Sequence, residues 1–248
     1  MDAASQLMNT FGAEVLEYPA SGFNASVAWW QRVMDRSTAQ FCSSAQEESW
    51  PHSIAGVVSG GSHFNEELHG NAVKNHKCFC RQQKIGYHHV EYDFLKGSQQ
   101  HAMFNKMFSI MHAMEAAPYG SWILWVDRDV LFINTSVSIR EMVEHAQAAR
   151  TTPSDCSIVV STSVNAGIVL YRKTCWTMRM LDYWLRRTRE DDGLCGRVTH
   201  GYDQVVFTFA LLELLGWKEA YSRDPKLALS LTSVPLRSVA ACATERSR

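Results

Sequence analysis

The sequence predicts an α/β fold in which a mixed, mostly parallel β-sheet is flanked by helices. From residue 53 onward, short apolar stretches alternate with longer stretches of helical periodicity. One stretch, residues 122–126, is apolar throughout, which is typical of a central strand covered on both faces. The composition, 46% apolar and 20% charged over 248 residues, is globular and excludes disordered, collagen-like and low-complexity classes.

The expected elements follow in order along the chain. Strands are expected at residues 53–58, 88–92, 122–126, 157–161 and 167–171, because these short runs are apolar or alternate apolar with polar residues. Helices are expected at residues 66–83, 103–114, 174–189 and 202–215, the third of which begins with a threonine and the last of which ends before Gly216. One further amphipathic stretch, residues 26–34, carries Trp29 and Trp30.

This distribution predicts three parts. Residues 1–50 are an N-terminal extension, residues 51–220 form the α/β domain, and residues 221–248 are a C-terminal tail without a recognisable role in a core. No run approaches the ~20 apolar residues of a membrane helix, and the first residues lack the basic and apolar regions of a signal peptide. We therefore expect no membrane segment in this chain.

Charge and cysteine content narrow the functions further. Lys+Arg 24 against Asp+Glu 25 gives a formal net charge of -1, so no basic field exists to hold a nucleic acid. The seven cysteines, an odd number, are interpreted mainly as small buried apolar residues. Two N-glycosylation sequons, beginning at Asn24 and Asn134, matter only if the chain is secreted.

The most informative motif is the Asp127-Arg128-Asp129 sequence that follows the central strand. Two-residue alternation predicts that both aspartates point to the same side while Arg128 faces away. Ligands of open α/β sheets bind beyond the carboxyl ends of the strands, and two neighbouring carboxylates repel unless a cation or a shared proton lies between them. Their hard oxygen ligands suit Mg²⁺ or Mn²⁺ with open positions for phosphate oxygens. The motif therefore predicts a metal that holds a diphosphate.

Two alternatives remain open for this motif. Asp is also favoured in an ordinary strand-to-turn exit, where its side chain binds the local backbone. Phosphatases of the haloacid dehalogenase type also place Asp-x-Asp after an apolar strand, with the first Asp as nucleophile. They favour Thr or Val two positions after the second Asp, where this chain has Leu131, and their motif lies nearer the domain start.

Several segments, taken in order, resemble glycosyltransferase family 34. They are an apolar strand with a small polar loop, residues 75–81, Gly86-Tyr87, residues 103–106, residues 122–132, residues 165–172, Trp176 and Asp203-Gln204. The resemblance covers residues 53–217 and implies a GT-A-like fold. It further implies retaining, metal-dependent transfer of a hexose or pentose from a UDP-sugar or GDP-sugar to a glycan or glycoprotein. Golgi or secretory localisation is likewise an implication of the resemblance.

The same resemblance assigns roles to individual residues. It implies that Asp129 binds Mn²⁺ (or Mg²⁺) directly and that Asp127 lies near the ribose and the metal. The remaining implied roles are a loop at Ser59 and Gly60 facing the nucleoside, Lys106 near the donor, Asn165 and Gly167 lining the sugar pocket, and Asp203 and Gln204 beside the transferred sugar. From the residues alone, Lys106 also fits a solvated helix position and Asp203 a favourable first-turn charge.

The chain also departs from the family pattern. Ile85 stands where the family has His before Gly-Tyr, and Tyr202 where it often has a second acidic residue. The family supplies a further metal-binding His late in the chain, whereas the last His here is His200. A degenerate, non-catalytic homologue that binds a nucleotide-sugar is therefore the alternative to an active transferase.

Overall fold

A five-stranded sheet forms the centre of the molecule. The computed structural model describes residues 22–40, 53–61, 63–98, 102–148, 157–160, 165–190 and 202–214. Its strands are β1 (Ile54–Gly60), β2 (Gly86–Val90), β3 (Trp122–Val126), β4 (Ile158–Val160) and β5 (Ile168–Arg172), in the order β2-β1-β3-β5-β4. β1 pairs parallel with β2 and β3, whereas β5 pairs antiparallel with β3 and β4. Four strands thus share one direction, which confirms the mixed, mostly parallel sheet.

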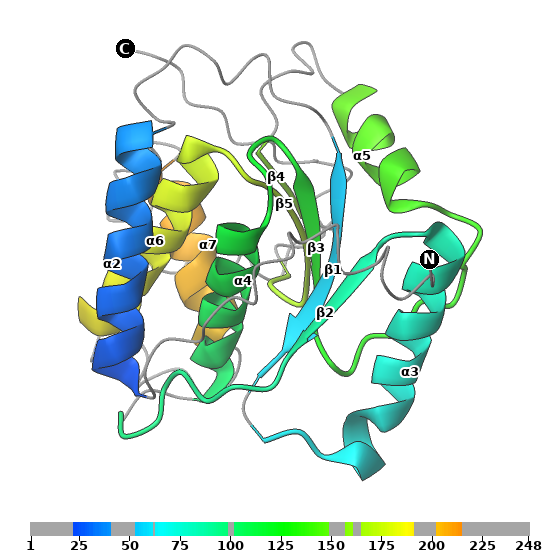
Figure 1. The fold of residues 1–248 in the computed structure, drawn as a ribbon, viewed down its shortest axis with the longest axis horizontal. Coiled ribbons are helices and arrows are strands. Elements are labelled where there is room, and N and C mark those ends of the chain that lie inside the picture. Colours follow the sequence, from blue (N-terminus) through cyan, green and yellow to red (C-terminus); the bar gives the residue numbers. More distant parts are fainter. Residues whose placement is uncertain are drawn as a thin grey trace.

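Helices cover both faces of this sheet (Figure 1). One layer holds α2 (Phe23–Gln40), α4 (Asn105–Ala116), α6 (Cys175–Glu190) and α7 (Tyr202–Leu214), and a 3-10 turn, Ala102–Phe104, leads into α4. The opposite layer holds α3 (Glu66–Gln83) and α5 (Ile139–Ala148). This three-layer α/β arrangement is that of a GT-A-like fold. Within the described ranges, no helix has the length and apolar character needed to cross a membrane.

The observed elements differ from the expected ones at a few places. β1 continues through Gly60, so Ser59 and Gly60 belong to the strand and not to a loop after it. β2 begins at Gly86, two residues before the expected start. α5 was not predicted from the sequence. α2 lies in the expected extension of residues 1–50 and packs against α4 and α6, while the boundaries at 50 and 220 stay predictions; the expected tail, residues 221–248, lies outside the described residues.

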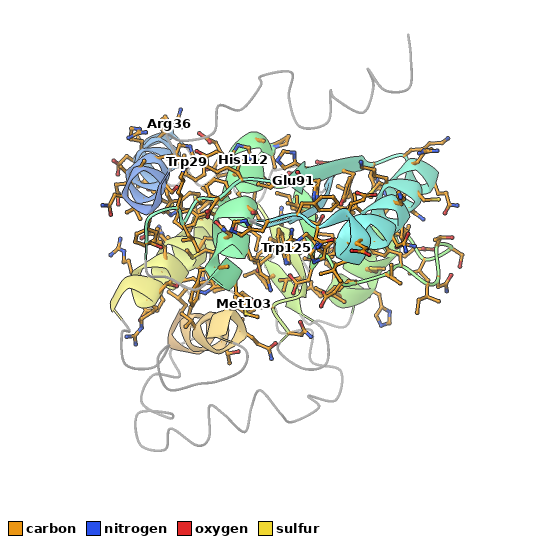
Figure 2. The ribbon with its side chains drawn as sticks, turned by 90° about the horizontal axis from the view of Figure 1, so that it is seen from below. Trp29, Arg36, Glu91, Met103, His112 and Trp125 are labelled. Carbon is orange, nitrogen blue, oxygen red and sulfur yellow. The ribbon has the colours of Figure 1, made fainter. Side chains whose placement is uncertain are left out.

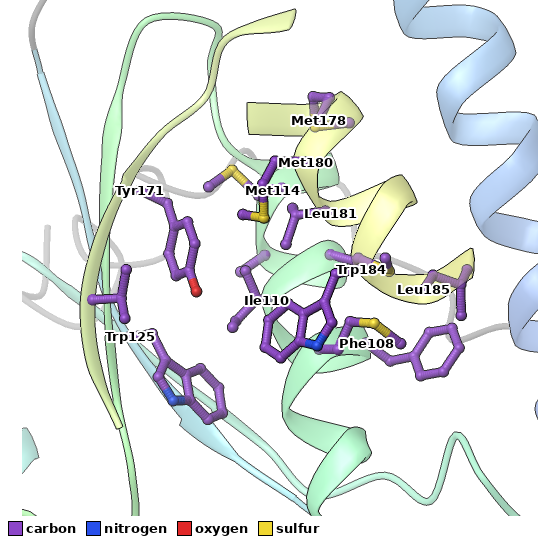
Figure 3. Packing of buried hydrophobic residues seen from close by; sticks show 14 of the residues in the cluster. Phe108, Ile110, Met114, Trp125, Tyr171, Met178, Met180, Leu181, Trp184 and Leu185 are labelled. Atoms are coloured by element: carbon purple, nitrogen blue, oxygen red, sulfur yellow. The ribbon is translucent and has the colours of Figure 1, made fainter. Parts of the chain in front are cut away.

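The larger core lies between the sheet and the four-helix layer (Figure 3). Trp125 from β3 and Tyr171 from β5 face Ile110 of α4 and Trp184 of α6, and all four are at most 1% exposed. Burial of an aromatic side chain removes a large apolar area from water, which stabilises this layer by about 25 cal/mol per Å². The carboxyl end of β3 is therefore held rigidly, and the residues that follow it start from a fixed position.

Helix α3 begins and ends where its local sequence dictates. The Asn65 side-chain oxygen accepts hydrogen bonds from the backbone amides of Glu67 and Leu68, which otherwise lack partners at a helix N-terminus. Glu66 and Glu67 add negative charge to the first turn, where the helix dipole favours it. At the other end Lys84 adopts a left-handed conformation with φ 54°, so the chain leaves the helix and enters β2.

A histidine pair is buried between β2 and α4. The Nε2 atom of His88 lies 3.3 Å from Nδ1 of His112, and the two rings stack. Trp29 and Phe94 also pack against the His112 ring (Figure 2 shows Trp29 and His112 together). Burial lowers the pKa of His112 to about 3, with a smaller contribution from His88. Both imidazoles are therefore neutral at physiological pH.

This pair predicts a loss of stability in acid. An unfolded histidine has a pKa of about 6.5, so between pH 6.5 and about 3 the unfolded chain binds a proton that native His112 does not. As the pH decreases through this range, His112 therefore lowers the free energy of unfolding by up to ~1.4 kcal/mol per pH unit. Urea titrations across this range should show a shallower pH dependence for His112→Phe than for the unmodified chain. Exposed His145 on α5 is the control: His145→Phe should keep the original slope, and equal slopes for all three proteins would contradict the assignment.

Candidate functional site

Asp127 is fixed at the exit of β3 by three hydrogen bonds. Its Oδ1 accepts from the indole nitrogen of Trp125 at 2.9 Å, and its backbone amide donates to the carbonyl of Gly167 at 2.8 Å. Its own carbonyl accepts from the Val130 amide at 3.1 Å, which closes a turn. The strand therefore ends at Val126, and the chain reverses within four residues of its carboxyl end.

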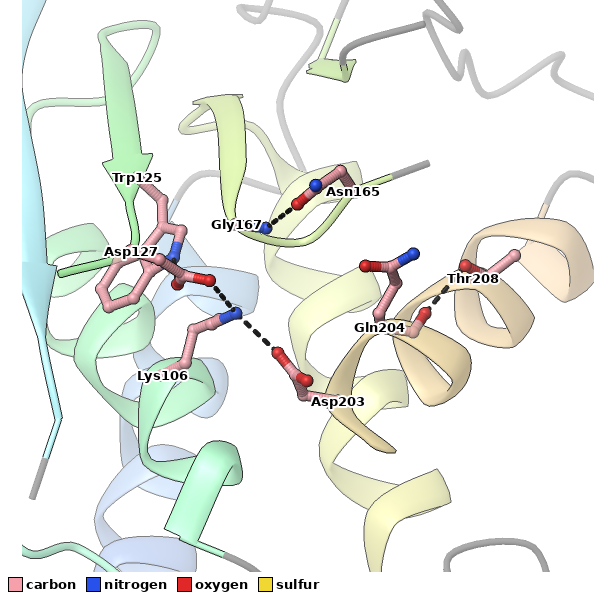
Figure 4. A network of polar contacts seen from close by, with 8 residues as sticks. All are labelled: Lys106, Trp125, Asp127, Asn165, Gly167, Asp203, Gln204 and Thr208. Atoms are coloured by element: carbon pink, nitrogen blue, oxygen red, sulfur yellow. Dashed lines mark hydrogen bonds and ion pairs between the residues drawn. The ribbon is translucent and has the colours of Figure 1, made fainter. Parts of the chain in front are cut away.

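Lys106 joins Asp127 to Asp203 (Figure 4). Its ammonium donates to Asp127 Oδ2 at 2.9 Å and to Asp203 Oδ2 at 2.6 Å. The three side chains come from β3, α4 and α7, and their exposed fractions are 30% for Asp127, 11% for Lys106 and 8% for Asp203. Asn105 steadies the start of α4 by donating to Asp93 from its side chain. The structure thus brings together three of the predicted site residues, which we call the Lys106 cluster.

Asn165 and Gly167 complete one side of this cluster. The Asn165 side-chain oxygen accepts from the Gly167 amide at 2.6 Å, which orders the entry into β5. A Cβ atom at Gly167 would lie 2.8 Å from Asp127 Oδ2 and 2.8 Å from Asn165 Oδ1. Only glycine leaves room for both oxygens, so the sequence at this position is explained by the close approach of Asp127. Both predicted sugar-pocket residues therefore lie at the Lys106 cluster.

Burial and charge act together on the Lys106 cluster. Burial lowers the pKa of Lys106, but the two carboxylates outweigh it and hold the pKa above its usual value. Burial raises the pKa of Asp127, and Asp203 raises it further, against the opposing effects of Lys106 and the Trp125 indole. One ammonium cannot neutralise two carboxylates, so the cluster with a charged Lys106 keeps a net charge of -1. Fully buried Tyr171 lies close enough that both aspartates add to the burial that raises its pKa well above the usual value.

Asp129 has a different environment from Asp127. It is exposed in the turn, whereas both carboxylate oxygens of Asp127 are already engaged in hydrogen bonds. The expected two-residue alternation does not extend across the pair, because the strand ends at Val126 before either residue. The Arg128 guanidinium lies beside Gly61 at the end of β1 and also interacts electrostatically with Asp127 and Asp129. The Lys106 cluster, Arg128 and Asp129 together carry a formal charge of -1.

Ser59 and Gly60 make their contacts with β2 and not with the Lys106 cluster. Ser59 is fully buried, with its hydroxyl 2.7 Å from the Tyr87 hydroxyl and 3.0 Å from His89 Nδ1. A Cβ at Gly60 would lie 2.4 Å from the Val90 carbonyl oxygen, so this position admits no side chain. Ser59 therefore presents no exposed hydroxyl, and its contribution to a nucleoside site would be to hold Tyr87 and His89 in place.

Gln204 follows Asp203 in the first turn of α7. Its side chain is half-buried and is drawn beside Asp203 at the same end of the helix (Figure 4). Its backbone carbonyl accepts a hydrogen bond from the Thr208 hydroxyl at 2.8 Å, one turn later. The helix start thus presents a carboxylate and an amide in succession, the first bound to Lys106.

The segment after Asp129 is attached to α3 by residues to which sequence analysis gave no role. His76 Nε2 lies 2.7 Å from the Val130 carbonyl, which only accepts, so this nitrogen carries the proton. Burial lowers the pKa of His76 despite this hydrogen bond, which favours the neutral ring. Asn75 binds both the backbone amide and the carbonyl of Phe132. These contacts fix the turn that carries Asp129; the sequence signal was the adjacent Asn-His pair within the family-like segment.

The oxygen ligands present fit a hard divalent cation. Asp129 is exposed, Asp127 retains 30% exposure, and the local formal charge, -1 with Arg128 included, favours a cation such as Mg²⁺ or Mn²⁺. Within the described residues no three His, Cys, Asp or Glu side chains are arranged to hold a metal on their own. The site therefore fits a cation that takes one or two carboxylates from the protein and further oxygens from phosphates and water.

We expect Lys106 to be a strong determinant of stability. Lys106→Met leaves two partly buried carboxylates without their cation, and loss of one partner from a buried ion pair costs about 3–5 kcal/mol. The deficit should shrink at mildly acidic pH, because protonation of either carboxylate removes their repulsion. Lys74 is a matched control, since its pair with Glu66 is exposed and Lys74→Met should cost less than about 1 kcal/mol. Similar losses for the two variants in urea unfolding at pH 7 would contradict a buried role for Lys106.

Part of the chain is similar to known glycosyltransferases. A family model described as the galactosyl transferase GMA12/MNN10 family matches residues 54–151, a segment that contains Lys106, Asp127 and Asp129. The chain is 31% identical over 115 residues to "Putative glycosyltransferase 7" of Arabidopsis thaliana, covering 45% of this chain and 25% of the relative. It is 28% identical over 114 residues to "Glycosyltransferase 6" of the same plant, covering 42% of this chain and 26% of the relative.

The matched part therefore spans about a quarter of the length of these curated relatives. It begins with β1 and includes β3 and the turn that carries the two aspartates, whereas Asn165, Gly167 and Asp203 lie beyond it. The match also favours a transferase over a haloacid dehalogenase-type phosphatase as the origin of the Asp-x-Asp motif. Residues 54–151 are therefore similar to the galactosyl transferase GMA12/MNN10 family, in agreement with the resemblance to glycosyltransferase family 34.

Proposed function

We propose that this chain is a metal-dependent glycosyltransferase that moves a hexose or pentose from a UDP-sugar or GDP-sugar to a glycan or glycoprotein. The observation that carries this proposal is the Lys106 cluster, in which Asp127 meets Lys106 and Asp203 at the carboxyl end of the central strand. Similarity of residues 54–151 to the galactosyl transferase family supports this class of reaction. The retaining stereochemistry is the outcome that the family resemblance implies.

The charges around Asp129 suit a nucleotide diphosphate bound with a cation. A bound Mn²⁺ or Mg²⁺ would act as a Lewis acid that stabilises negative charge on the diphosphate leaving group. Asp129 would hold it directly, while Asp127, whose oxygens bind Trp125 and Lys106, would hold the surrounding geometry. The Lys106 ammonium adds a positive charge near the same phosphates. Without a cation, a diphosphate would meet a net negative surface and bind weakly.

Asp203 and Gln204 would face the sugar. Glycosyl transfer passes through an oxocarbenium-like state with positive charge at the anomeric carbon, and a preorganised carboxylate stabilises such charge. Asp203 is 6% exposed and bound to Lys106, so its position is fixed before substrate arrives. Gln204 would orient a sugar hydroxyl, and Asn165 with Gly167 would form the wall of the sugar pocket.

The compartment is part of the same proposal. Cys175 is disulfide-bonded, and disulfides persist mainly in oxidising compartments such as the secretory pathway. Cys78 and Cys80 are free thiols. The disulfide at Cys175 supports a Golgi or other secretory location, in which nucleotide-sugars and nascent glycans meet.

A panel of nucleotide-sugars with and without Mn²⁺ tests the activity. Release of UDP or GDP that requires both the metal and an acceptor glycan would support transfer. Binding of the nucleotide-sugar without release in any acceptor mixture would instead identify the degenerate homologue. Absence of metal-dependent binding for every UDP-sugar and GDP-sugar would contradict both.

Asp129 provides a direct test of the metal site. Asp129→Ala should remove Mn²⁺-dependent UDP or GDP binding measured by calorimetry, because the exposed ligand is lost, whereas Asp129→Asn should retain a small part through its remaining oxygen. The folded structure should be unaffected, since Asp129 is exposed. Glu144→Ala, which removes an exposed carboxylate from α5, is the control and should leave binding unchanged. Unchanged nucleotide affinity in folded Asp129→Ala would overturn the assignment.

A further inference from the structure

Of the two N-glycosylation sequons, one lies in an exposed loop and the other in a packed helix. The first comprises Asn134, Thr135 and Ser136 in the connection between β3 and α5, and the second begins at Asn24 in the first turn of α2. We propose that Asn134 accepts an N-linked oligosaccharide and that Asn24 does not. The inference concerns a covalent modification of the chain and is independent of the transfer chemistry proposed above.

The geometry at Asn134 has the form that a glycosyl acceptor requires. Its side-chain oxygen accepts from the Ser136 hydroxyl at 2.6 Å and from the Ser136 amide at 3.1 Å. Both hydrogen bonds reach the oxygen, so the amide nitrogen stays available, and withdrawal of electron density through the oxygen favours loss of its proton. Asn134 and Ser136 are both exposed, and Ile133 beside them is 95% exposed. An approaching enzyme would therefore meet the exposed side chains of Asn134 and Ser136.

The loop is also held in one position, so that the acceptor points away from the domain. The Asn75 side chain of α3 donates to the carbonyl of Phe132 and accepts from its amide. The Phe132 ring stacks on Phe79 with centroids 3.9 Å apart. Gln83, at the end of α3, donates to the carbonyl of Thr135 at 2.9 Å. The loop is therefore attached through its backbone and through Phe132, and a glycan on Asn134 displaces none of these contacts.

The sequon at Asn24 differs at its hydroxyl residue. Asn24 itself is exposed, but Ser26 is fully buried, and its hydroxyl lies within hydrogen-bond distance of the carbonyls of Gly22 and Phe94. Because Ser26 lies in a helix, this sequon does not form the turn that Asn134 and Ser136 form. Withdrawal of Ser26 from the core would break the hydrogen bonding of its hydroxyl. Folding of α2 onto the core therefore removes this sequon from use.

The reaction needs a donor that the secretory pathway supplies, namely a lipid-diphosphate-linked oligosaccharide with its transferase. The Asn134 amide nitrogen forms a bond to the anomeric carbon, the bond from that carbon to the diphosphate breaks, and the amide loses one proton. The disulfide at Cys175 is an independent sign of the oxidising compartment in which this occurs. A glycan here would also cover the exposed Ile133 and Leu131 side chains.

Expression of the full chain behind a cleavable secretion signal in eukaryotic cells tests the inference. Treatment with peptide N-glycosidase should convert the secreted protein to one faster-migrating band and leave Asp at position 134 in the peptide mass spectrum. Asn134→Gln and Ser136→Ala should each abolish the shift. Asn24→Gln, the matched control, should retain it in full.

The peptide spectrum of the unmodified chain settles the matter even if a variant fails to be secreted. Occupancy at position 24, or a secreted chain without any glycan, would overturn the proposal. Mn²⁺-dependent nucleotide binding by Asn134→Gln should equal that of the unmodified chain. Loss of the glycan and failure of the proposed transferase function are therefore separate results.

Discussion

The structure around the candidate site depends on one buried cation, the ammonium of Lys106. It is shared between Asp127 on the central strand and Asp203 on α7, two residues far apart in the sequence. A buried pair of this kind adds little net stability relative to apolar side chains, but removal of one member is costly. The ammonium therefore acts mainly as a determinant of geometry. It fixes the start of α4 and α7 relative to the end of β3, where donors of this class of fold bind.

The two aspartates of the motif have separate roles because they stand on either side of a strand end. Asp127 faces the helix layer, where Lys106 and Trp125 occupy its oxygens. Asp129 lies in an exposed turn that α3 stabilises from outside through His76 and Asn75. One layer of helices thus positions the inner carboxylate and the other positions the outer one. This division leaves the Asp129 carboxylate exposed while Asp127 stays bound in the buried ion pairs.

Much of the fold could be predicted from local sequence. The uninterrupted apolar run of β3 and the helical pattern of residues 66–83 predicted the correct bounds for β3 and α3. α5 was missed, although Ser138 and Glu141 form a capping box that marks its start in the sequence. Its buried residues, Ile139, Val143 and Ala146, are only three and recur at helical spacing over a short helix of 10 residues.

The sequence predicted which residues belong to the candidate site better than it predicted how they contact one another. The contact between Lys106 and Asp203 spans 97 residues, and no spacing rule joins them; both entered through resemblance to a family. The burial of Ser59 could not be predicted because it depends on how far β1 extends beside β2. The alternation expected for Asp127 and Asp129 assumed that the strand continues through them, whereas β3 ends at Val126, before either residue.

The coupling between Lys106 and Asp203 tests this account most directly. A double-mutant cycle would compare the free energies of unfolding of the unmodified chain, Lys106→Met, Asp203→Asn and the double variant at pH 7. If the ammonium joins the two elements, the second substitution should cost much less in the presence of the first, with a coupling energy of about 1 kcal/mol or more. Additive effects, within about 0.5 kcal/mol, would show that the two side chains act independently and would contradict the account.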